Sequence, residues 1–453
     1  MAIFKAYDIR GVVPGELDAD KAYGIGRAIA HFIAAGPVAV GRDARTHSPE
    51  LTGVLIEAIR DEGLDVLDLG LVATPMLYFG VETLAAAAGV MVTASHNPAQ
   101  YNGFKICREH AIPVGEASGL REIEALVAAR ARAPKAEVRG RVMRHDIEAA
   151  YAQHVLAVGD SRPALKVAID CGNGMASAGL GTVLERLGVD VVPLYFEPDG
   201  SFPNHEADPL KVENLADLID AVRSHHADFG VAFDGDGDRA IFVDERGTPV
   251  SADLATALIA RHLLHRNPGS LVLYDLRSSR VVAEEIERCG GEARMCRVGH
   301  SFVKAQMREE GALFAGELSG HLYFRFSETL VADDGTAALV AILDVLGAEQ
   351  RPLSELIDPL RRYAASGEIN RRVADVDFVL AEVEAEHAGA PVVSKLDGLL
   401  VRYPDWWFNL RPSNTEPVLR LNLEADTEAE MIQRREAMLA RIESLAEGRR
   451  ARA

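Results

Sequence analysis

Three aspartates alternate with two glycines in the segment Asp234-Gly-Asp236-Gly-Asp238, which Arg239 follows. Carboxylates at alternate positions, separated by residues without side chains, can curl around one hard cation and offer it oxygen ligands. The adjacent Arg239 can balance the charge of the cluster or hold a phosphate oxygen. The segment therefore predicts a metal site, and an acidic turn without a ligand is the alternative.

An EF-hand calcium loop is the competing type of metal site. The same aspartates match its first ligands, and Glu245 falls at its twelfth position. However, the sixth position of that loop requires glycine, and Arg239 stands there. The flanking apolar runs 231–233 and 240–243 are typical of strands, whereas an EF-hand loop lies between helices. We therefore expect a metal loop between strands.

A second polar segment, Thr93-Ala-Ser95-His-Asn-Pro98, directly follows the apolar run 89–92 and is followed by Lys105. Ligands gather at the carboxyl ends of strands in parallel sheets. Ser95 is therefore a candidate nucleophile or phosphate carrier, with Lys105 as a nearby cation. A polar turn closed by proline is the alternative interpretation.

Two further segments carry groups that suit a sugar phosphate. Glu317 and Ser319, two residues apart among glycines, can accept and donate hydrogen bonds to neighbouring sugar hydroxyls. The segment 411–417 combines a guanidinium, two hydroxyls, an amide and backbone N–H groups, which together form a plausible phosphate cradle. Ordinary polar turns also explain either segment taken alone.

The charge balance of the chain limits its partners. Among 453 residues, 48 basic and 68 acidic side chains give a formal net charge of −20. An acidic chain without a long run of Lys or Arg is a poor match for nucleic acid or an anionic membrane. An anionic substrate would require basic groups concentrated in a cleft.

The cysteines and the N-terminal residues indicate a cytoplasmic protein. The N-terminus carries charges where a secretory leader needs an apolar core, and no apolar run approaches the ~20 residues of a membrane span. No two cysteines have Cys-x-x-Cys spacing, which is typical of free thiols in a reducing compartment. These cysteines are Cys107, Cys171, Cys289 and Cys296.

The elements that must position these groups recur along the chain. An apolar run ending in aspartate occurs at Asp43, Asp170, Asp234 and Asp275. Such runs are typical of buried strands, and helical patterns lie between them. One helical pattern begins at Ser48-Pro49, where we expect a capping serine and a proline at the first helical position. The alternation predicts largely parallel sheets covered by helices on both faces, in several related α/β units.

Changes in composition suggest four domains. The first three are α/β domains, and the last has alternating strands at 399–403 and 418–423 followed by a charged helix, which predicts a smaller α+β domain. The expected domains are 1–146 with the Ser95 loop, 147–248 with the aspartate loop, 249–363 with the Glu317 loop, and 364–453 with the phosphate cradle.

Taken together, these segments resemble one family. In this order, and with Tyr7-Asp-Ile-Arg10-Gly11, they are similar to the α-D-phosphohexomutases, most of all their bacterial phosphomannomutase/phosphoglucomutase branch. The resemblance spans the whole chain. It implies four domains around a central cleft, three related mixed α/β domains plus a smaller C-terminal α+β domain. It also implies a Mg²⁺-dependent isomerase that interconverts hexose 1-phosphate and 6-phosphate through a phosphoserine and a 1,6-bisphosphate intermediate.

The resemblance implies a role for each matching residue. Ser95 would carry the phosphoryl group and would bind Mg²⁺ together with Asp234, Asp236 and Asp238. The other catalytic residues would be Arg10, Lys105, Arg239 and His300. The substrate would be bound by Arg277, Glu317, Ser319, His321, Arg411, Ser413, Asn414 and Thr415. The expected partner is a sugar phosphate, with hexose 1,6-bisphosphate as activator, on a monomer or homodimer.

Some alternatives stay open at this stage. Arg277 stands where the branch often has lysine, and arginine keeps the charge but cannot act as a base. The general base is His300, Lys105 or another group. The segment Gly-Glu-Leu-Ser around Glu317 argues for mannose or glucose over glucosamine, for which Gly-Glu-Gln-Ser is typical in the family. A metal-dependent phosphatase and a binding module without catalysis are the remaining alternatives.

Overall fold

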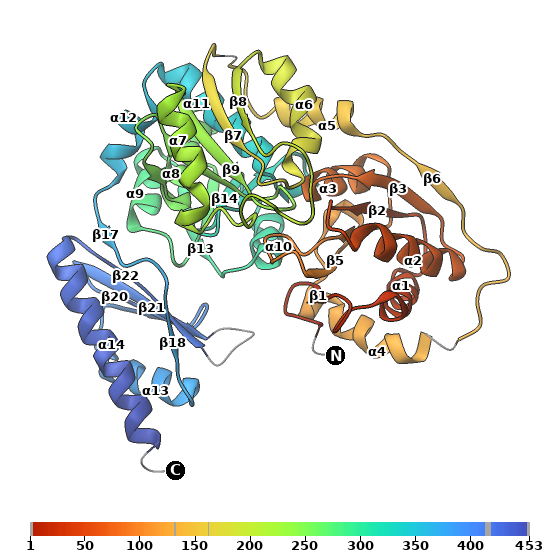
Figure 1. The fold of residues 1–453 in the computed structure, drawn as a ribbon. Coiled ribbons are helices and arrows are strands. Elements are labelled where there is room, and N and C mark those ends of the chain that lie inside the picture. The colour runs from red at the N-terminus through yellow and green to blue at the C-terminus, as the bar shows by residue number, and fades with distance from the viewer. Residues whose placement is uncertain (1–2, 131–132, 162, 413–417, 451–453) are drawn as a thin grey trace.

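The computed structural model describes the chain except for residues 1–2, 131–132, 162, 413–417 and 451–453. Its strands form four separate sheets, and we call the parts of the chain that contain them domains I to IV. In Figure 1, domains I to III gather in one body, and domain IV (blue) lies beside domain III.

Domain I has a six-stranded sheet of order β1-β5-β4-β2-β3-β6. Neighbouring strands among β2, β3, β4 and β6 are parallel, whereas β5 runs antiparallel to β4 and to β1. The strands are β1 (Ile9–Val12), β2 (Val38–Arg42), β3 (Val66–Leu71), β4 (Ala88–Val92), β5 (Tyr101–Arg108) and β6 (Val142–Arg144). The helices are α1 (Ala19–Ile33), α2 (Ser48–Asp61), α3 (Thr74–Thr83) and α4 (Leu120–Arg130), with short 3₁₀ turns η1 (Glu109–Ala111) and η2 (Glu116–Ser118).

Domains II and III have five-stranded sheets of order β11-β10-β9-β7-β8 and β13-β12-β14-β15-β16. Domain II contains α5 (Glu148–Leu156), β7 (Lys166–Asp170), α6 (Ala176–Leu187), β8 (Asp190–Leu194), η3 (Val212–Leu215), α7 (Ala216–Ser224), β9 (Phe229–Phe233), β10 (Ala240–Asp244) and β11 (Pro249–Val250). Domain III contains α8 (Ala252–Arg266), β12 (Leu271–Asp275), α9 (Arg280–Arg288), β13 (Glu292–Cys296), α10 (His300–Glu310), β14 (Phe314–Gly316), β15 (Leu322–Arg325), β16 (Val331–Asp333), α11 (Gly335–Glu349), α12 (Leu353–Ile357) and η4 (Asp358–Leu360).

The three sheets share one pattern, which confirms the expected related α/β units. Each has a parallel trio followed by an antiparallel strand, in the orders β3-β2-β4-β5, β8-β7-β9-β10 and β13-β12-β14-β15. The expectation of largely parallel sheets is therefore wrong in part. The third strand of each trio returns directly through a short loop, which allows only antiparallel pairing, whereas a parallel neighbour needs a long crossover.

Successive residues of the central strands face two different cores, as the two-residue period of a strand requires. In β2, Val38 and Val40 pack with α1, α2 and α4, whereas Ala39 belongs to a core that continues through domains I to III. In β12, Val272 faces this shared core and Leu273 faces the opposite side. Helices therefore cover both faces, as predicted, and one continuous core fixes the three α/β domains relative to one another.

Domain IV has an antiparallel sheet and a core of its own. Its strand order is β17-β22-β21-β20-β19, with β18 also paired to β22. It contains β17 (Ala364–Ala365), β18 (Ile369–Arg372), α13 (Val376–Glu386), β19 (Val392–Ser394), β20 (Leu399–Arg402), β21 (Trp406–Pro412), β22 (Val418–Ala425) and α14 (Glu428–Arg450). The predicted strands at 399–403 and 418–423 and the charged terminal helix are confirmed. The core around Trp406 and Phe408 is separate from the shared core.

The start of α2 differs from the expectation. Ser48 is the first residue of the helix and does not cap it, because His47 occupies the capping position without a side-chain hydrogen bond. The Ser48 hydroxyl instead donates to Asp43 Oδ1 at 2.5 Å. A buried carboxylate without hydrogen-bond donors costs more free energy than an uncapped helix end near solvent. The Ser48 hydroxyl therefore bonds to Asp43 and not to the helix end.

Two features of the described residues bear on the expected environment. All four cysteines are free, and three of them are buried. Within the described part of the chain, every helix is too short or too polar to cross a bilayer.

Candidate active site

Three predicted site segments occupy the same position in the three related sheets. Each is the loop from the third parallel strand to the antiparallel strand that follows it. The loop β4–β5 carries Ser95, the loop β9–β10 carries 234–239, and the loop β14–β15 carries 317–321. Because the shared core fixes the sheets relative to one another, these loops meet at fixed positions.

Ser95 lies against the aspartate loop of domain II. Its hydroxyl donates to Asp234 Oδ2 at 2.9 Å and lies 3.2 Å from Nδ1 of His96. The Ser95 backbone is left-handed, with φ of 51°, and its N–H donates to Thr93 Oγ1 at 2.9 Å. A left-handed serine costs about 1 kcal/mol or more unless its surroundings hold it there. The loop therefore presents one hydroxyl to the neighbouring domain.

Gly235 makes this close approach possible. A Cβ atom at this position would lie 2.5 Å from the carbonyl oxygen of Ser95. Real Cβ atoms do not approach backbone oxygens so closely, so any side chain at this position would move the two loops apart. Gly235, which separates Asp234 from Asp236, thus allows the aspartate loop to contact the serine loop.

The three aspartates are buried, and their carboxylate oxygens converge. One oxygen from each of Asp234, Asp236 and Asp238 lies within 4.8 Å of the others. Lys105 Nζ donates to Oδ2 of Asp236 at 2.6 Å and to Oδ2 of Asp238 at 2.5 Å, and Thr74 Oγ1 donates to Oδ2 of Asp236 at 2.6 Å. The loop joins two antiparallel strands, so it is not an EF-hand loop.

The electrostatics of this cluster suit a divalent cation. Burial and then the neighbouring carboxylates raise the pKa of Asp234 well above its usual value. Burial also opposes ionisation of Asp238, but Lys105 and His321 lower its pKa well below the usual range. The buried Oδ1 atoms of Asp236 and Asp238 have no hydrogen-bond partner among the residues that the structure describes. Orphaned anionic oxygens are costly, and a bound cation satisfies them.

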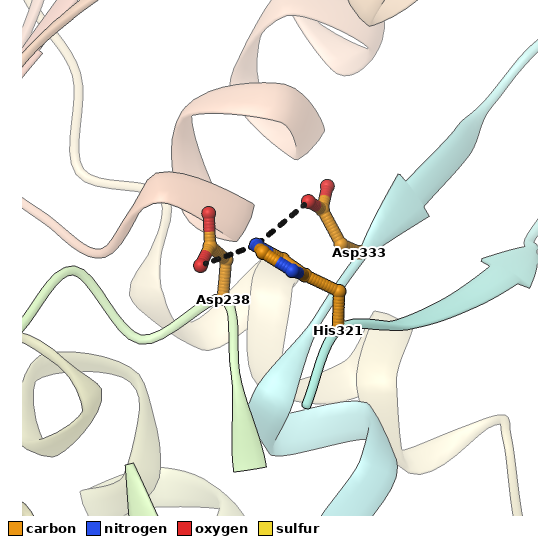
Figure 2. Close-up of side chains that lie close together, drawn as sticks. All are labelled: Asp238, His321 and Asp333. Atoms are coloured by element: carbon orange, nitrogen blue, oxygen red, sulfur yellow. Dashed lines mark ion pairs between the residues drawn. The ribbon is translucent and has the colours of Figure 1, made fainter. Parts of the chain in front are cut away.

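His321 connects this cluster to domain III. Its Nε2 lies 3.4 Å from Asp238 Oδ1 and 3.9 Å from Asp333 Oδ2, as Figure 2 shows. This trio is a second group whose ligand atoms are close enough to hold a cation. The charges around this trio favour a bound cation less. Lys304 Nζ already pairs with Asp333 Oδ1 at 2.7 Å, and Arg239 Nε lies 3.3 Å from His321 Nε2.

The predicted sugar-binding loop is held by its own hydrogen bonds. Glu317 Oε1 accepts from the N–H of Gly299 at 2.7 Å, and its Oε2 accepts from the Tyr323 hydroxyl. Ser319 Oγ lies 2.9 Å from Nδ1 of His321. A carboxylate oxygen has more than one lone pair, so Glu317 can still accept a hydrogen bond from a ligand hydroxyl.

His300 begins α10 and lies close to His321, with 6.3 Å between ring centroids. Burial, together with Lys304 and Lys105, lowers its pKa well below the usual value. In the described part of the chain, its buried Nδ1 has no hydrogen-bond partner. A neutral imidazole with a free ring nitrogen can accept a proton. Lys105 differs, because Asp236 and Asp238 outweigh burial and raise its pKa above the usual value.

Three predicted arginines surround the site from different domains. Arg10 Nη1 donates to Asn97 Oδ1 at 2.5 Å and to the carbonyl of Ala94 at 3.3 Å, so it contacts the Ser95 loop. Arg277 of domain III and Arg411 of domain IV each place a guanidinium nitrogen 3.6 Å from Glu368 Oε2. The predicted residues Ser413, Asn414 and Thr415 lie outside the described residues.

Sequence reasoning missed several residues of this site. It did not single out Thr74, Asp333 or Lys304, because each reaches the site from a helix or strand without a recognisable motif. It also missed Arg45, whose guanidinium contacts the Ser95 loop. One signal existed for Arg45, since Asp43-x-Arg45 repeats the spacing of Asp275-x-Arg277 at the same place in a related sheet.

Comparison with known proteins assigns the family. Models of phosphoglucomutase/phosphomannomutase alpha/beta/alpha domains I, II and III match residues 1–133, 149–247 and 251–363, and the C-terminal domain model matches residues 368–442. The chain therefore belongs to the phosphoglucomutase/phosphomannomutase family.

Individual relatives agree along the whole chain. A phosphomannomutase/phosphoglucomutase of Pseudomonas aeruginosa is 42% identical over 440 residues, which cover 95% of this chain and 93% of the relative. A phosphoglucomutase of Neisseria gonorrhoeae is also 42% identical, over 96% of this chain and 95% of the relative. The crystal structure of a phosphoglucomutase/phosphomannomutase family protein from Burkholderia thailandensis has a TM-score of 0.90 and 35% identity, and the match covers 98% of this chain and 97% of that one.

Proposed function

We propose that this protein is a Mg²⁺-dependent phosphohexomutase that interconverts the 1-phosphate and 6-phosphate of mannose and glucose. The observation that carries the proposal is the contact of Ser95 Oγ with Asp234 Oδ2 at 2.9 Å, between a strained nucleophile loop and a buried aspartate cluster. Phosphoryl transfer needs a positioned nucleophile and groups that neutralise the phosphoryl oxygens. Both are present at this contact.

In the proposed reaction, phospho-Ser95 donates its phosphoryl group to the free hydroxyl of a hexose 1-phosphate. The bond between phosphorus and Ser95 Oγ breaks, and phosphorus bonds to the C6 hydroxyl oxygen. A base takes the proton of that hydroxyl, and the departing Ser95 oxygen gains a proton. We assign the base to His300, because its buried Nδ1 has no hydrogen-bond partner among the described residues. The resulting 1,6-bisphosphate reverses its orientation, and its other phosphoryl group returns to Ser95.

The charges around Ser95 support this chemistry. Arg10, Lys105 and Arg239 lie around the serine and aspartate loops and would stabilise the phosphoryl oxygens. Asp234, Asp236 and Asp238, together with a phosphoserine oxygen, would hold Mg²⁺, which when bound supplies further neutralisation of these oxygens. The chain's own residues orient the nucleophile whether or not the ion is bound.

Substrate binding would combine a grip on hydroxyls with a grip on phosphate. Glu317 and Ser319 would bind two sugar hydroxyls. Arg277, Arg411 and the segment 413–415 would hold the phosphate that does not react, whereas His321 would contact the substrate beside the aspartate cluster. Mannose and glucose differ only at C2, so a grip on the hydroxyls of C3 and C4 would accept both sugars. Domain IV would close over the substrate to bring its phosphate cradle near Ser95.

We test this proposal by turnover of mannose 1-phosphate and glucose 1-phosphate with Mg²⁺ and a trace of hexose 1,6-bisphosphate. Conversion of both sugars to their 6-phosphates, absent in Ser95→Ala, supports the proposal. No turnover of one sugar at saturating concentration contradicts dual specificity. Conversion of glucosamine phosphate alone would instead support a phosphoglucosamine mutase, and steady release of inorganic phosphate would support a phosphatase.

We propose domain boundaries at residues 146 and 363 and, because β11 pairs with β10, at residue 250 in place of the expected 248. We also propose a cytoplasmic location and a monomer or homodimer without nucleic acid or membrane partners. Size-exclusion chromatography with light scattering tests the oligomeric state. Limited proteolysis tests the boundaries, because exposed linkers are cut first.

A further inference from the structure

Arg45 is a charged side chain buried directly behind the Ser95 loop. Its side chain has no exposure to solvent, and its Nε pairs with Asp43 Oδ2 at 3.1 Å. Burying a guanidinium is costly unless its donors are satisfied, so a fully buried arginine indicates a specific set of acceptors. Apart from Asp43, the acceptors of the Arg45 guanidinium are backbone carbonyls of one loop.

Four backbone carbonyls of the loop 95–101 accept hydrogen bonds from this one guanidinium. Nη2 donates to the carbonyls of Ser95 at 2.7 Å and Asn97 at 2.5 Å. Nη1 donates to the carbonyls of Pro98 at 2.8 Å and Tyr101 at 3.0 Å. The planar fork of arginine presents donors in a fixed geometry, which a lysine ammonium cannot reproduce. The loop is therefore folded around Arg45.

The loop needs such a support because Ser95 is strained. Its left-handed backbone, with φ of 51°, persists only if the surrounding structure holds it. The guanidinium contacts the carbonyl of the strained residue itself. Arg45 thus acts on the nucleophile through the backbone carbonyl of Ser95, and its guanidinium is not exposed to a ligand.

Domain II closes the pocket around Arg45. The Phe202 ring centroid lies 5.0 Å from the guanidinium carbon. A Cβ atom at Gly200 would lie 2.1 Å from the Cα atom of Arg45, so glycine is required for the two chains to meet here. Domain II therefore supports the serine loop at two places. Gly235 lies against Ser95, and Gly200 and Phe202 lie against Arg45 behind the loop.

A buried network fixes the Arg45 side chain in turn. Asp43 Oδ1 accepts from the N–H of Arg45 at 3.0 Å and from the Ser48 hydroxyl at 2.5 Å. Ser48 Oγ accepts from Asn102 Nδ2 at 2.9 Å, and Asn102 belongs to β5 at the far end of the loop. The network spans the loop from its first residue to the strand after it.

We infer that Arg45 is the positioning residue of the Ser95 nucleophile, and that its four carbonyl contacts hold Ser95 Oγ in line for phosphoryl transfer. This inference deepens the proposed function and depends on it for the nature of the reaction. It predicts that loss of the contacts lowers kcat and leaves substrate affinity nearly unchanged, because no part of Arg45 is available to the sugar phosphate.

The test compares Arg45→Lys with a matched control, Arg27→Lys. Arg27 is also buried in domain I, where it pairs with Glu62 and donates to the carbonyls of Ala133 and Pro134 at 2.8 and 2.9 Å. Both changes remove one buried guanidinium and keep its charge. Arg27 contacts no loop of the site, so it reports the general cost of such a change to the fold.

We expect kcat of Arg45→Lys to fall about 100-fold, since a misplacement of about 1 Å has this effect, with KM within about twofold. We expect kcat of Arg27→Lys to stay within about twofold. Thermal melts show that each variant is folded at the assay temperature. Should Arg45→Lys not fold, Asp43→Asn, which weakens the orientation of Arg45, replaces it. An equal fall of kcat in both arginine variants, or a change confined to KM, overturns the inference.

Amide hydrogen exchange of the peptide 94–101 tests positioning without turnover. We expect its exchange to rise at least tenfold in Arg45→Lys and not in Arg27→Lys, because only the first variant releases the loop. Unchanged exchange overturns the inference even if activity falls. If the unmodified protein turns over no sugar phosphate but the exchange result holds, the proposed reaction is wrong and the positioning role stands.

Discussion

At the scale of the residue, the site depends on two glycines where loops of different domains meet. Both glycines lie in domain II. Gly235 leaves room for the backbone of Ser95, and Gly200 leaves room for the backbone of Arg45. The spacing of the aspartates predicted a metal loop, and Gly235 is one of its spacers. Its second task, contact with Ser95, depends on a residue 140 positions away and could not be predicted from local sequence.

Gly235→Ala tests this contact. The new methyl group would lie 2.5 Å from the Ser95 carbonyl, so the loops must separate and the nucleophile moves away from the aspartates. We expect kcat to fall about 100-fold and the Mg²⁺ concentration for half-maximal activity to rise. Steady-state kinetics over a Mg²⁺ series measures both.

Gly53→Ala is the control for that substitution. Gly53 lies in α2, and a Cβ atom there would have nothing within 4 Å. Alanine in an exposed part of a helix stabilises by about 0.5–1 kcal/mol. We therefore expect unchanged activity and slightly higher stability. Full activity of Gly235→Ala in the same assay would contradict the contact described here.

The residues of the site differ in how far the sequence predicted them. Ser95, Lys105 and the three aspartates belong to short polar segments after apolar runs, where the chemistry is local and visible. Arg45 binds backbone carbonyls, which have no sequence signature.

At the scale of the element, the junction of α3, α5 and the loop after β15 holds a half-buried histidine. The His154 ring lies between Phe79, 4.8 Å away, and Phe326, 4.3 Å away, measured between ring centroids. These residues come from domains I, II and III. Burial lowers the pKa of His154 to about 4. The ring is therefore neutral in the folded protein at neutral pH.

This histidine makes the junction sensitive to acid. The unfolded chain binds the proton near its usual pKa of about 6.5, and the folded chain binds it only near pH 4. Stability is therefore lost as pH falls through this window, by up to about 3 kcal/mol. His154→Phe keeps the aromatic packing and removes the titration, so we expect a weaker loss of stability between pH 7 and pH 4. Urea unfolding at each pH measures it, and parallel curves for both proteins would contradict the shift.

Element types were predicted better than their pairing. The runs ending in Asp43, Asp170, Asp234 and Asp275 are followed by loops, as expected, and the first, second and fourth lie in or next to central parallel strands. The antiparallel pairing of β5, β10 and β15 was not predicted. The apolar run of a buried strand looks the same whether the strand pairs in a parallel or an antiparallel manner. Yet this pairing creates the three loops that form the site.

At the scale of the whole molecule, the separate core of domain IV predicts independent unfolding. The core of domains I to III is continuous, whereas domain IV joins domain III through polar contacts such as Arg280 with Glu424 at 3.2 Å and Asp426 at 2.7 Å. We expect two thermal transitions in calorimetry, with the smaller one from domain IV. Such a polar interface also suits the closure of domain IV over the substrate that we propose.

Two core substitutions assign these transitions. Phe408 is buried in the core of domain IV and Phe233 in the shared core. Truncation of a buried phenylalanine costs about 3–5 kcal/mol. We expect Phe408→Ala to lower the midpoint of the smaller transition alone, and Phe233→Ala to lower that of the larger. A single transition that both variants shift equally would show that the four domains unfold as one unit.

The central claim is that Ser95 carries the transferred phosphoryl group. Rapid mixing with hexose 1,6-bisphosphate, acid quench and mass spectrometry of the peptide around Ser95 measure it directly. We predict that phosphate appears on Ser95, leaves it when mannose 1-phosphate or glucose 1-phosphate is added, and does both at least as fast as kcat. Phosphate on another residue, or a Ser95 phosphate that turns over more slowly than the reaction, would contradict the claim.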